Sequence, residues 1–287
     1  MGIVMNAIHI NWTKPYRERF SLPYCVEDFE LLTTVLSALK WREKNGSIKM
    51  ITDSLGKEFY KNIGISHIWD GGIETYLDNI PETINPGIFW AAGKLFALKE
   101  QTAPIAMIDT DFIVWEEILF DNLGAVTAIH SEPLYADVYP AKEYFNMTNG
   151  YAFDNGWDWG LDALNTAFCV FKDDNLLKYY TTEAVRFMEN TADDVEDTLK
   201  YMVFAEQRLL PMCAKKMGLY YSSFSNLDRL FTHGENYFTH TWGMKQQMRD
   251  IPELRYDFCR RCADRIKKDF PDMEETLKKV ECLKQYF

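Results

Sequence analysis

The chain has 287 residues, of which 43 are Asp or Glu and 31 are Lys or Arg, so its formal net charge is −12. Hydrophobic residues make up 47% of the sequence, and its 8 Trp, 16 Tyr and 19 Phe exclude disorder as the main state. The acidic balance argues against a nucleic-acid partner, because the basic footprint that binds phosphate backbones is missing. We therefore expect a globular protein with a substantial core.

From the sequence we expect no membrane-spanning segment and no secretory signal. Its longest apolar run is interrupted by Lys94 and falls short of the roughly 20 residues that a spanning helix requires. The first six residues lack the basic segment of a secretory signal. Six scattered cysteines predict a reduced protein rather than a disulfide framework. We expect a cytoplasmic protein, and peripheral contact with a membrane stays open.

The first 110 residues alternate between short apolar runs and segments with helical spacing. The helix at 26–44 ends at Asn45-Gly46, and the helix at 54–62 begins after the capping residue Asp53. This alternation predicts an α/β fold with a mostly parallel central sheet flanked by helices. The predicted strands are residues 3–10, 48–52, 66–69 and 105–108, and the helices are 26–44, 54–62 and 86–99.

The second half is less regular. A segment at 135–165 is rich in Tyr, Trp, Asn and Gly, and loops of this length are more often functional than idle. The charged, helical residues 246–287 are expected to pack as an extension on a catalytic domain formed by residues 1–245. The remaining predicted elements are strands at 126–129, 167–171 and 219–221 and helices at 175–190 and 195–217.

Two carboxylates, Asp109 and Asp111, follow the buried strand at 105–108 directly. Alternate residues at a strand end point to one side, so both can reach a single cation. Oxygen ligands suit Mg²⁺ or Mn²⁺, which bridge substrate phosphates and neutralise a diphosphate leaving group. The alternative interpretation is a solvated turn, since Asp pairs also suit turns. Asn11-Trp12 and Asp53 end other strands, and ligands bind at such ends in parallel sheets.

Three further motifs follow in the chain. They are Asn165-Thr166-Ala167, Glu206-Gln207, and the loop from His240 to Lys245 with sequence His-Thr-Trp-Gly-Met-Lys. In their order and spacing the motifs resemble those of GT-A fold glycosyltransferases. The similarity is greatest to the retaining branch of glycogenin and the lipopolysaccharide galactosyltransferases, with its uncharacterised bacterial relatives. Two departures are Ala167, where that branch has Gly, and a final loop that is one residue shorter before Lys245.

The resemblance implies a Rossmann-like GT-A fold and transfer of a sugar, with retention, from a nucleotide sugar such as a UDP-sugar. The acceptor would be a carbohydrate or a glycolipid. It also implies roles for individual residues, with Gln207 beside the anomeric carbon. Metal ligands would be Asp109, Asp111 and His240; catalytic residues would be Gln207, Glu206 and Asn165; nucleotide-sugar contacts would come from Asn11, Trp12, Asp53, Lys94, Thr110 and Lys245.

Two other functions remain open on the sequence. Asp109-Thr110-Asp111 also resembles the nucleophile motif of haloacid-dehalogenase phosphatases, although Ile113 and the preceding βαβ region depart from that pattern. A non-catalytic protein that binds nucleotide sugars is the other alternative. Individual residues also have structural interpretations: Lys94 could extend to solvent, and Trp157 and Trp159 could anchor the long loop instead of stacking on an acceptor.

Overall fold

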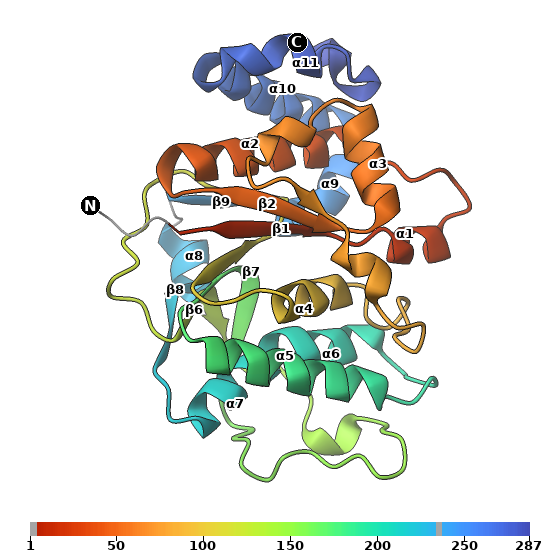
Figure 1. The fold of residues 1–287 in the computed structure, drawn as a ribbon, viewed down its shortest axis with the longest axis vertical. Coiled ribbons are helices and arrows are strands. Elements are labelled where there is room, and N and C mark those ends of the chain that lie inside the picture. The colour runs from red at the N-terminus through yellow and green to blue at the C-terminus, as the bar shows by residue number, and fades with distance from the viewer. Residues whose placement is uncertain (1–4, 234–236) are drawn as a thin grey trace.

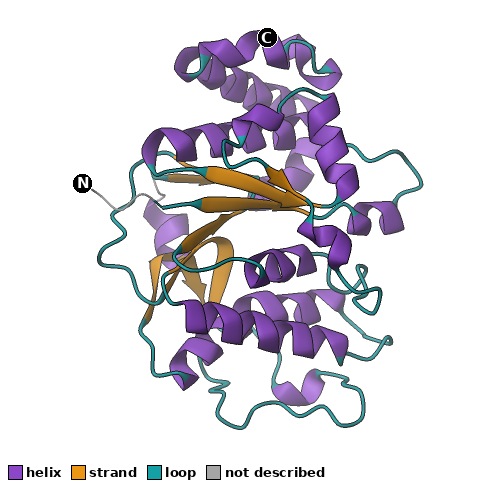
Figure 2. Cartoon of the chain, in the orientation of Figure 1, coloured by secondary structure: helices purple, strands orange, loops and turns teal. Residues whose placement is uncertain are grey.

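A seven-stranded sheet lies between two layers of helices in the computed structural model, which describes residues 5–233 and 237–287 (Figure 1, Figure 2). The strand order is β3-β2-β1-β4-β7-β6-β8. Within this sheet, as far as the structure describes it, β7 alone runs antiparallel to its neighbours, so the predicted mostly parallel sheet is confirmed. The strands are β1 (Ala7–Asn11), β2 (Ile48–Thr52), β3 (Ile73–Glu74), β4 (Ile105–Ile108), β6 (Val126–Glu132), β7 (Ala163–Phe171) and β8 (Tyr221–Asn226).

The two helical layers follow from alternation along the strands. In β4, Ala106 and Ile108 face one hydrophobic core, whereas Ile105 and Met107 face the other. In Figure 1 the α2 layer lies above the sheet and the α5 layer below it. The upper layer has α2 (Asp28–Lys44), α3 (Ser54–Asn62) and α9 (Lys245–Asp250), and α10 (Pro252–Asp269) and α11 (Glu274–Leu277) lie above α2, farther from the sheet. The lower layer has α4 (Ala92–Lys99), α5 (Asp174–Glu189), α6 (Thr198–Val203) and α7 (Leu209–Lys216).

A second, two-stranded sheet joins distant parts of the chain. Its strands β5 (Phe112–Val114) and β9 (Phe238–His240) pair antiparallel, with Phe112 opposite His240. The short helices α1 (Lys14–Arg19) and α8 (Leu227–His233) follow β1 and β8 respectively. The pairing of β5 with β9 places His240, the first residue of the loop that ends at Lys245, beside the segment that follows Asp109 and Asp111.

One predicted strand is wrong. Residues 66–69 contain a 3₁₀ helix, Ser66–Ile68, and the third strand of the sheet is Ile73–Glu74. Ile65 and Ile68 are buried three residues apart, which is the period of a 3₁₀ turn, and a short apolar run does not distinguish this from a strand. The helix predicted at 86–99 begins at Ala92, because turns occupy the residues around Pro86 and Gly87.

The long loop after β6 is held by its aromatic side chains. Trp157 is buried, and Trp159 stacks on Phe204 with ring centroids 5.2 Å apart. Arg208 donates to the carbonyl oxygens of Pro140 and Trp159, at 2.5 and 2.6 Å. Both tryptophans therefore anchor this loop, as the structural interpretation expects.

The C-terminal helices pack on α2 and share its hydrophobic core. Cys259, Ile266 and Leu277 are buried in the same cluster as Phe29 of α2. Asp28 accepts hydrogen bonds from Tyr286 and Arg255, each at 2.7 Å. The boundary at residue 245 stays a prediction. Across residues 5–233 and 237–287, no helix is both long and apolar enough to cross a bilayer.

Candidate functional site

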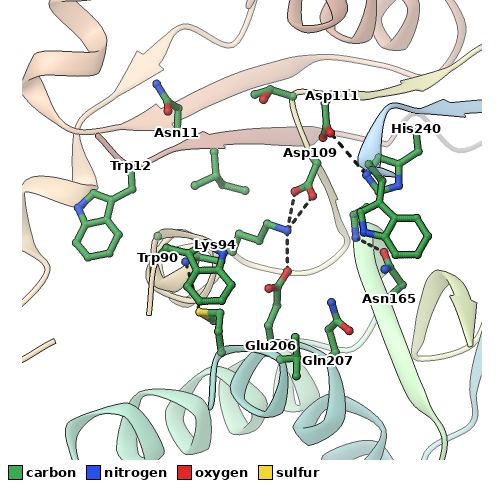
Figure 3. Close-up of a pocket in the computed structure, with 18 of the residues that line it drawn as sticks. Asn11, Trp12, Trp90, Lys94, Asp109, Asp111, Asn165, Glu206, Gln207 and His240 are labelled. Atoms are coloured by element: carbon green, nitrogen blue, oxygen red, sulfur yellow. Dashed lines mark hydrogen bonds and ion pairs between the residues drawn. The ribbon is translucent and has the colours of Figure 1, made fainter. Parts of the chain in front are cut away.

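A cavity of about 500 Å³ opens at the carboxyl ends of β1 and β4 (Figure 3). The N-terminal half supplies its upper wall, and the segment between α6 and α7 supplies its floor. All the predicted site residues except Asp53 line this cavity. They are Asn11, Trp12, Lys94, Asp109, Thr110, Asp111, Asn165, Glu206, Gln207, His240 and Lys245.

Asp109, Asp111 and His240 form a group that fits a divalent cation. One ligand atom from each residue lies within 4.8 Å of the others. Asp109 and Asp111 leave the end of β4, and the pairing of β5 with β9 adds His240, whose Nε2 is 3.8 Å from Asp111 Oδ2. Two carboxylates and an imidazole suit Mn²⁺ or Mg²⁺, with room left for phosphate oxygens.

The three groups have different protonation behaviour. Burial raises the pKa of Asp109 to about 6, although Lys94 pulls it down. Burial also opposes the charge of Asp111, but Lys245 and His240 outweigh it and hold its pKa below the ordinary value. Burial lowers the pKa of His240 to about 4, so its imidazole is neutral near pH 7 and can offer a lone pair to a metal.

Each aspartate is paired with a lysine. Lys94 Nζ, on α4, lies 2.7 Å from Asp109 Oδ1 and 2.6 Å from Glu206 Oε1. Burial disfavours the charge of Lys94, but Asp109 and Glu206 outweigh it and raise the pKa of the amine. Lys245 Nζ lies 3.1 Å from Asp111 Oδ2 and 3.3 Å from Glu30 Oε1. Lys94 therefore points into the cavity and does not extend to solvent.

A π-helical turn, Phe204–Arg208, presents Glu206 and Gln207 at the floor of the cavity. A wider turn of this kind leaves a carbonyl group to be satisfied from outside, and the Tyr180 hydroxyl donates to the Glu206 carbonyl oxygen at 2.6 Å. The Glu206 side chain accepts from Thr166 Oγ1 at 2.5 Å. Such turns occur frequently at functional sites.

Two residues that the sequence analysis missed, Glu132 and Tyr139, connect Asn165 to Gln207. Asn165 Nδ2 donates to Glu132 Oε1 at 2.9 Å. The Tyr139 hydroxyl lies 2.6 Å from Glu132 Oε2 and 2.7 Å from Gln207 Oε1. Glu132 follows the predicted strand at 126–129, so its place at a strand end was the available signal.

Three tryptophans surround the cavity, and two of them, Trp90 and Trp242, were also missed. Trp90 and Trp242 are 41% and 50% exposed, although side chains of this size are usually buried. Trp242 stacks on His240 with an interplanar angle of 11°. Trp12 approaches α4 so closely that a Cβ at Gly93 would lie 2.8 Å from the Trp12 Cβ, which requires glycine there. Exposed rings around a cavity provide surfaces for a planar base or a sugar.

The structure places Asn11 and Asp53 beside structural partners. Asn11 Nδ2 donates to the Tyr24 hydroxyl at 2.8 Å, which holds its amide at the cavity edge. Asp53 caps α3 by accepting from Gly56 N at 2.9 Å, and its other oxygen accepts from Thr13 N and Oγ1. With both oxygens engaged and the side chain outside the cavity, Asp53 fixes the loop that carries Trp12.

A protein-family model described as "Family of unknown function (DUF6734)" matches residues 5–280. No curated protein matches the sequence. Crystal structures of the glycosyltransferase GlyE of Streptococcus pneumoniae TIGR4 are similar in structure: the apo form has 11% identity and a TM-score of 0.38, and a second structure has 12% and 0.39. Both matches cover 77% of this chain, which spans only 44% and 45% of the GlyE chains.

Proposed function

This chain belongs to the family of unknown function DUF6734, and we propose that it is a metal-dependent glycosyltransferase. The donor would be a nucleotide sugar, first of all a UDP-sugar, and the acceptor a carbohydrate or a glycolipid. Retention of anomeric configuration and a cytoplasmic location belong to the same proposal. Mn²⁺ or Mg²⁺ would be the cofactor.

One observation carries the proposal: Asp109, Asp111 and His240 converge within 4.8 Å in a cavity that also contains two lysines and exposed aromatic rings. A bound divalent cation would supply positive charge to a diphosphate leaving group. The lysines lie beside the carboxylates, where they can contact phosphate oxygens that reach the same point. Carboxylates, lysines and stacking surfaces together match the parts of a nucleotide sugar.

The side chains divide the cavity between the parts of such a donor. The nucleoside would lie at the Trp12 and Trp90 end, and Figure 3 shows these two side chains on the same side of Lys94, away from His240. Lys94 and Lys245 would hold the diphosphate. The sugar would then reach the floor, where Lys94 and Thr166 fix the Glu206 carboxylate. Glu206 would hold a sugar hydroxyl while Gln207 faces the anomeric carbon.

A thermal-shift screen of nucleotide sugars, with and without Mn²⁺, tests the binding part of the proposal. We expect UDP and a subset of UDP-sugars to raise the melting temperature, and the increase to require the metal, because a ligand stabilises the folded state that binds it. The proposal is wrong if none of the nucleotides changes the melting temperature at any concentration of Mn²⁺ or Mg²⁺.

Gln207→Ala separates a transferase from a non-catalytic binding protein. The variant should retain the Mn²⁺-dependent shift by UDP and lower slow hydrolysis of the donor sugar about tenfold or more, because a contact used mainly in the transition state affects turnover rather than binding. Gln246→Ala, on an exposed position of α9, is the matched control. Wild-type protein that binds donors but hydrolyses none, with any acceptor added, would favour the non-catalytic alternative. Turnover of p-nitrophenyl phosphate would favour the phosphatase.

A further inference from the structure

Behind the floor of the cavity lies a buried polar network that the proposed chemistry does not use directly. Glu132, Asn165 and Tyr139 are 8%, 5% and 4% exposed. Asn165 and Gln207 line the cavity, while Glu132 and Tyr139 lie behind them. A buried carboxylate needs partners to compensate for the water it has lost, and both oxygens of Glu132 have one.

The orientation of the Asn165 amide is fixed. Its Oδ1 accepts from the backbone N–H of Ala167 at 3.0 Å, and its Nδ2 donates to Glu132 Oε1 at 2.9 Å. If the oxygen and nitrogen of the Asn165 amide were exchanged, its NH₂ group would face the Ala167 N–H, donor against donor. Its oxygen would face Glu132 Oε1, acceptor against acceptor. One N–H of Nδ2 donates to Glu132, and the second has no partner among the residues described and can serve the cavity that Asn165 lines.

The orientation of the Gln207 amide follows from counting protons. The Tyr139 oxygen lies 2.6 Å from Glu132 Oε2 and 2.7 Å from Gln207 Oε1, yet a hydroxyl has one proton to donate. With Glu132 ionised, one of these two contacts would join two oxygens with no proton between them. The oxygen and nitrogen of an amide have nearly the same shape, and hydrogen bonding decides which is which.

The Tyr139 hydroxyl donates its proton preferentially to the Glu132 carboxylate. An ionised carboxylate is a better acceptor than an amide oxygen, because an O–H···O⁻ hydrogen bond is about twice as strong as a neutral one. With Glu132 ionised, Tyr139 would accept from the Gln207 amide, which requires Nε2 toward Tyr139 and Oε1 toward the cavity, the reverse of the orientation with Oε1 at 2.7 Å from the Tyr139 oxygen. Burial and Glu132 raise the pKa of Tyr139, which keeps the hydroxyl protonated.

We propose that Glu132 and Tyr139 are positioning residues that turn the Gln207 carbonyl oxygen into the cavity and the Asn165 N–H toward the same space. The inference rests on the proposed function for its consequence: a carbonyl oxygen beside the anomeric carbon stabilises positive charge that develops there, whereas an N–H opposes it. The network thus gives the floor one acceptor, the Gln207 carbonyl oxygen, and one donor, the Asn165 N–H, a pair that a single sugar hydroxyl can satisfy.

Glu132→Gln distinguishes this arrangement from one in which Glu132 is protonated. A glutamine there can still accept from Asn165 while its amide nitrogen donates to Tyr139, so it mimics the protonated acid and forces Tyr139 to donate to Gln207 Oε1. We expect kcat for donor hydrolysis to fall about tenfold or more while KM and the shift by UDP with Mn²⁺ stay unchanged. Turnover equal to the wild type would overturn the proposal.

Tyr139→Phe tests the same bond without any turnover. In ligand-free protein with ¹⁵N-labelled glutamine, one side-chain amide proton of Gln207 should be shifted downfield and protected from exchange with water. It should lose both features in Tyr139→Phe. Tyr144→Phe is the control, since the buried Tyr144 hydroxyl has no hydrogen-bond partner among the residues described. An unchanged Gln207 amide in Tyr139→Phe would overturn the proposal, whether or not the protein transfers sugar.

Discussion

Asp109 and Asp111 are separated by one residue, yet their pKa values shift in opposite directions. Burial dominates at Asp109 and raises its pKa, whereas Lys245 and His240 dominate at Asp111 and lower it. The sequence predicted both residues because they follow a buried strand directly. It missed Glu132 and Tyr139 because their partners Asn165 and Gln207 lie 33 and 68 residues away, and the strand-end position of Glu132 does not identify such a partner.

Asp111→Asn tests the metal assignment at this scale. An amide is a weaker ligand than a carboxylate and carries no charge, so we expect the Mn²⁺-dependent stabilisation by UDP to be lost. Differential scanning fluorimetry at fixed UDP and increasing Mn²⁺ measures it. Asp121→Asn, an exposed position outside the cavity, should behave like the wild type. An undiminished shift in Asp111→Asn would remove this residue from the metal site.

At the scale of elements, the site depends on two features that periodicity does not report. The β5–β9 pairing brings His240 to Phe112, and the π-helical turn breaks the helix predicted at 195–217 into three parts. Short strands and single wide turns are set by tertiary contacts, so the sequence predicted the helices and the main sheet better than these local features.

The Tyr180 hydroxyl donates a hydrogen bond to the π-helical turn, and Tyr180→Phe removes that bond. The Glu206 carbonyl oxygen would lose its 2.6 Å hydrogen bond inside the core, and an unsatisfied buried acceptor costs about 1–3 kcal/mol. We expect a decrease of that size in the free energy of unfolding by urea. Tyr179→Phe, at the preceding and less buried position of α5, should lower the free energy of unfolding by a smaller amount. An unchanged free energy of unfolding in Tyr180→Phe would mean that the Tyr180 hydroxyl does not support the turn.

A chain of hydrogen bonds connects β1, α2 and β5 through a buried histidine. Trp69 Nε1 donates to His9 Nδ1 at 3.1 Å, His9 Nε2 lies 2.9 Å from Ser37 Oγ, and Ser37 donates to the Phe112 carbonyl oxygen at 2.5 Å. Because Ser37 uses its proton on Phe112, His9 must donate from Nε2. The imidazole is therefore neutral, and a second proton on Nδ1 would face the Trp69 N–H.

This histidine predicts a loss of stability in acid. Burial lowers the folded-state pKa of His9 to about 3, so below pH 6.5 the unfolded chain takes up the proton first. The contribution of His9 is complete above pH 6.5 and decreases by roughly 1.4 kcal/mol per pH unit toward pH 3. Urea unfolding at pH 6.5 and 5 should show a smaller acid loss in His9→Gln than in wild type or exposed His67→Gln. Parallel pH dependence in all three would contradict the neutral assignment.

At the scale of the whole molecule, the sheet separates two hydrophobic cores, and the C-terminal helices complete one of them. The cavity lies at the carboxyl ends of β1 and β4, which are central strands of the sheet. Lys245 begins α9 and contacts Glu30 of α2. This contact therefore attaches to α2 both the loop from His240 to Lys245, which lines the cavity, and the start of the C-terminal helices. The sequence predicted helices after residue 245, but their share in the core depends on contacts with α2.

Leu277→Ala tests this shared core. Leu277 is 0% exposed, and truncation of a buried leucine costs about 2–5 kcal/mol. We expect one cooperative transition at lower temperature, with tryptophan fluorescence and the Mn²⁺-dependent binding of UDP lost together. Exposed Lys279→Ala should leave the transition in place. An early separate transition in Leu277→Ala, with binding retained above it, would show that the C-terminal helices unfold on their own.

The pairing of each aspartate with a lysine has a thermodynamic consequence. On the proposed function, a cation bound by Asp109 and Asp111 would release Lys94 and Lys245 for phosphate oxygens. A phosphate group bound by these lysines would in turn leave the carboxylates free for a cation. Linkage requires the two effects to be equal, so the nucleotide should increase the affinity for metal by the same factor as the metal increases the affinity for nucleotide. In an acidic chain, this mutual enhancement would make neither ligand bind well alone.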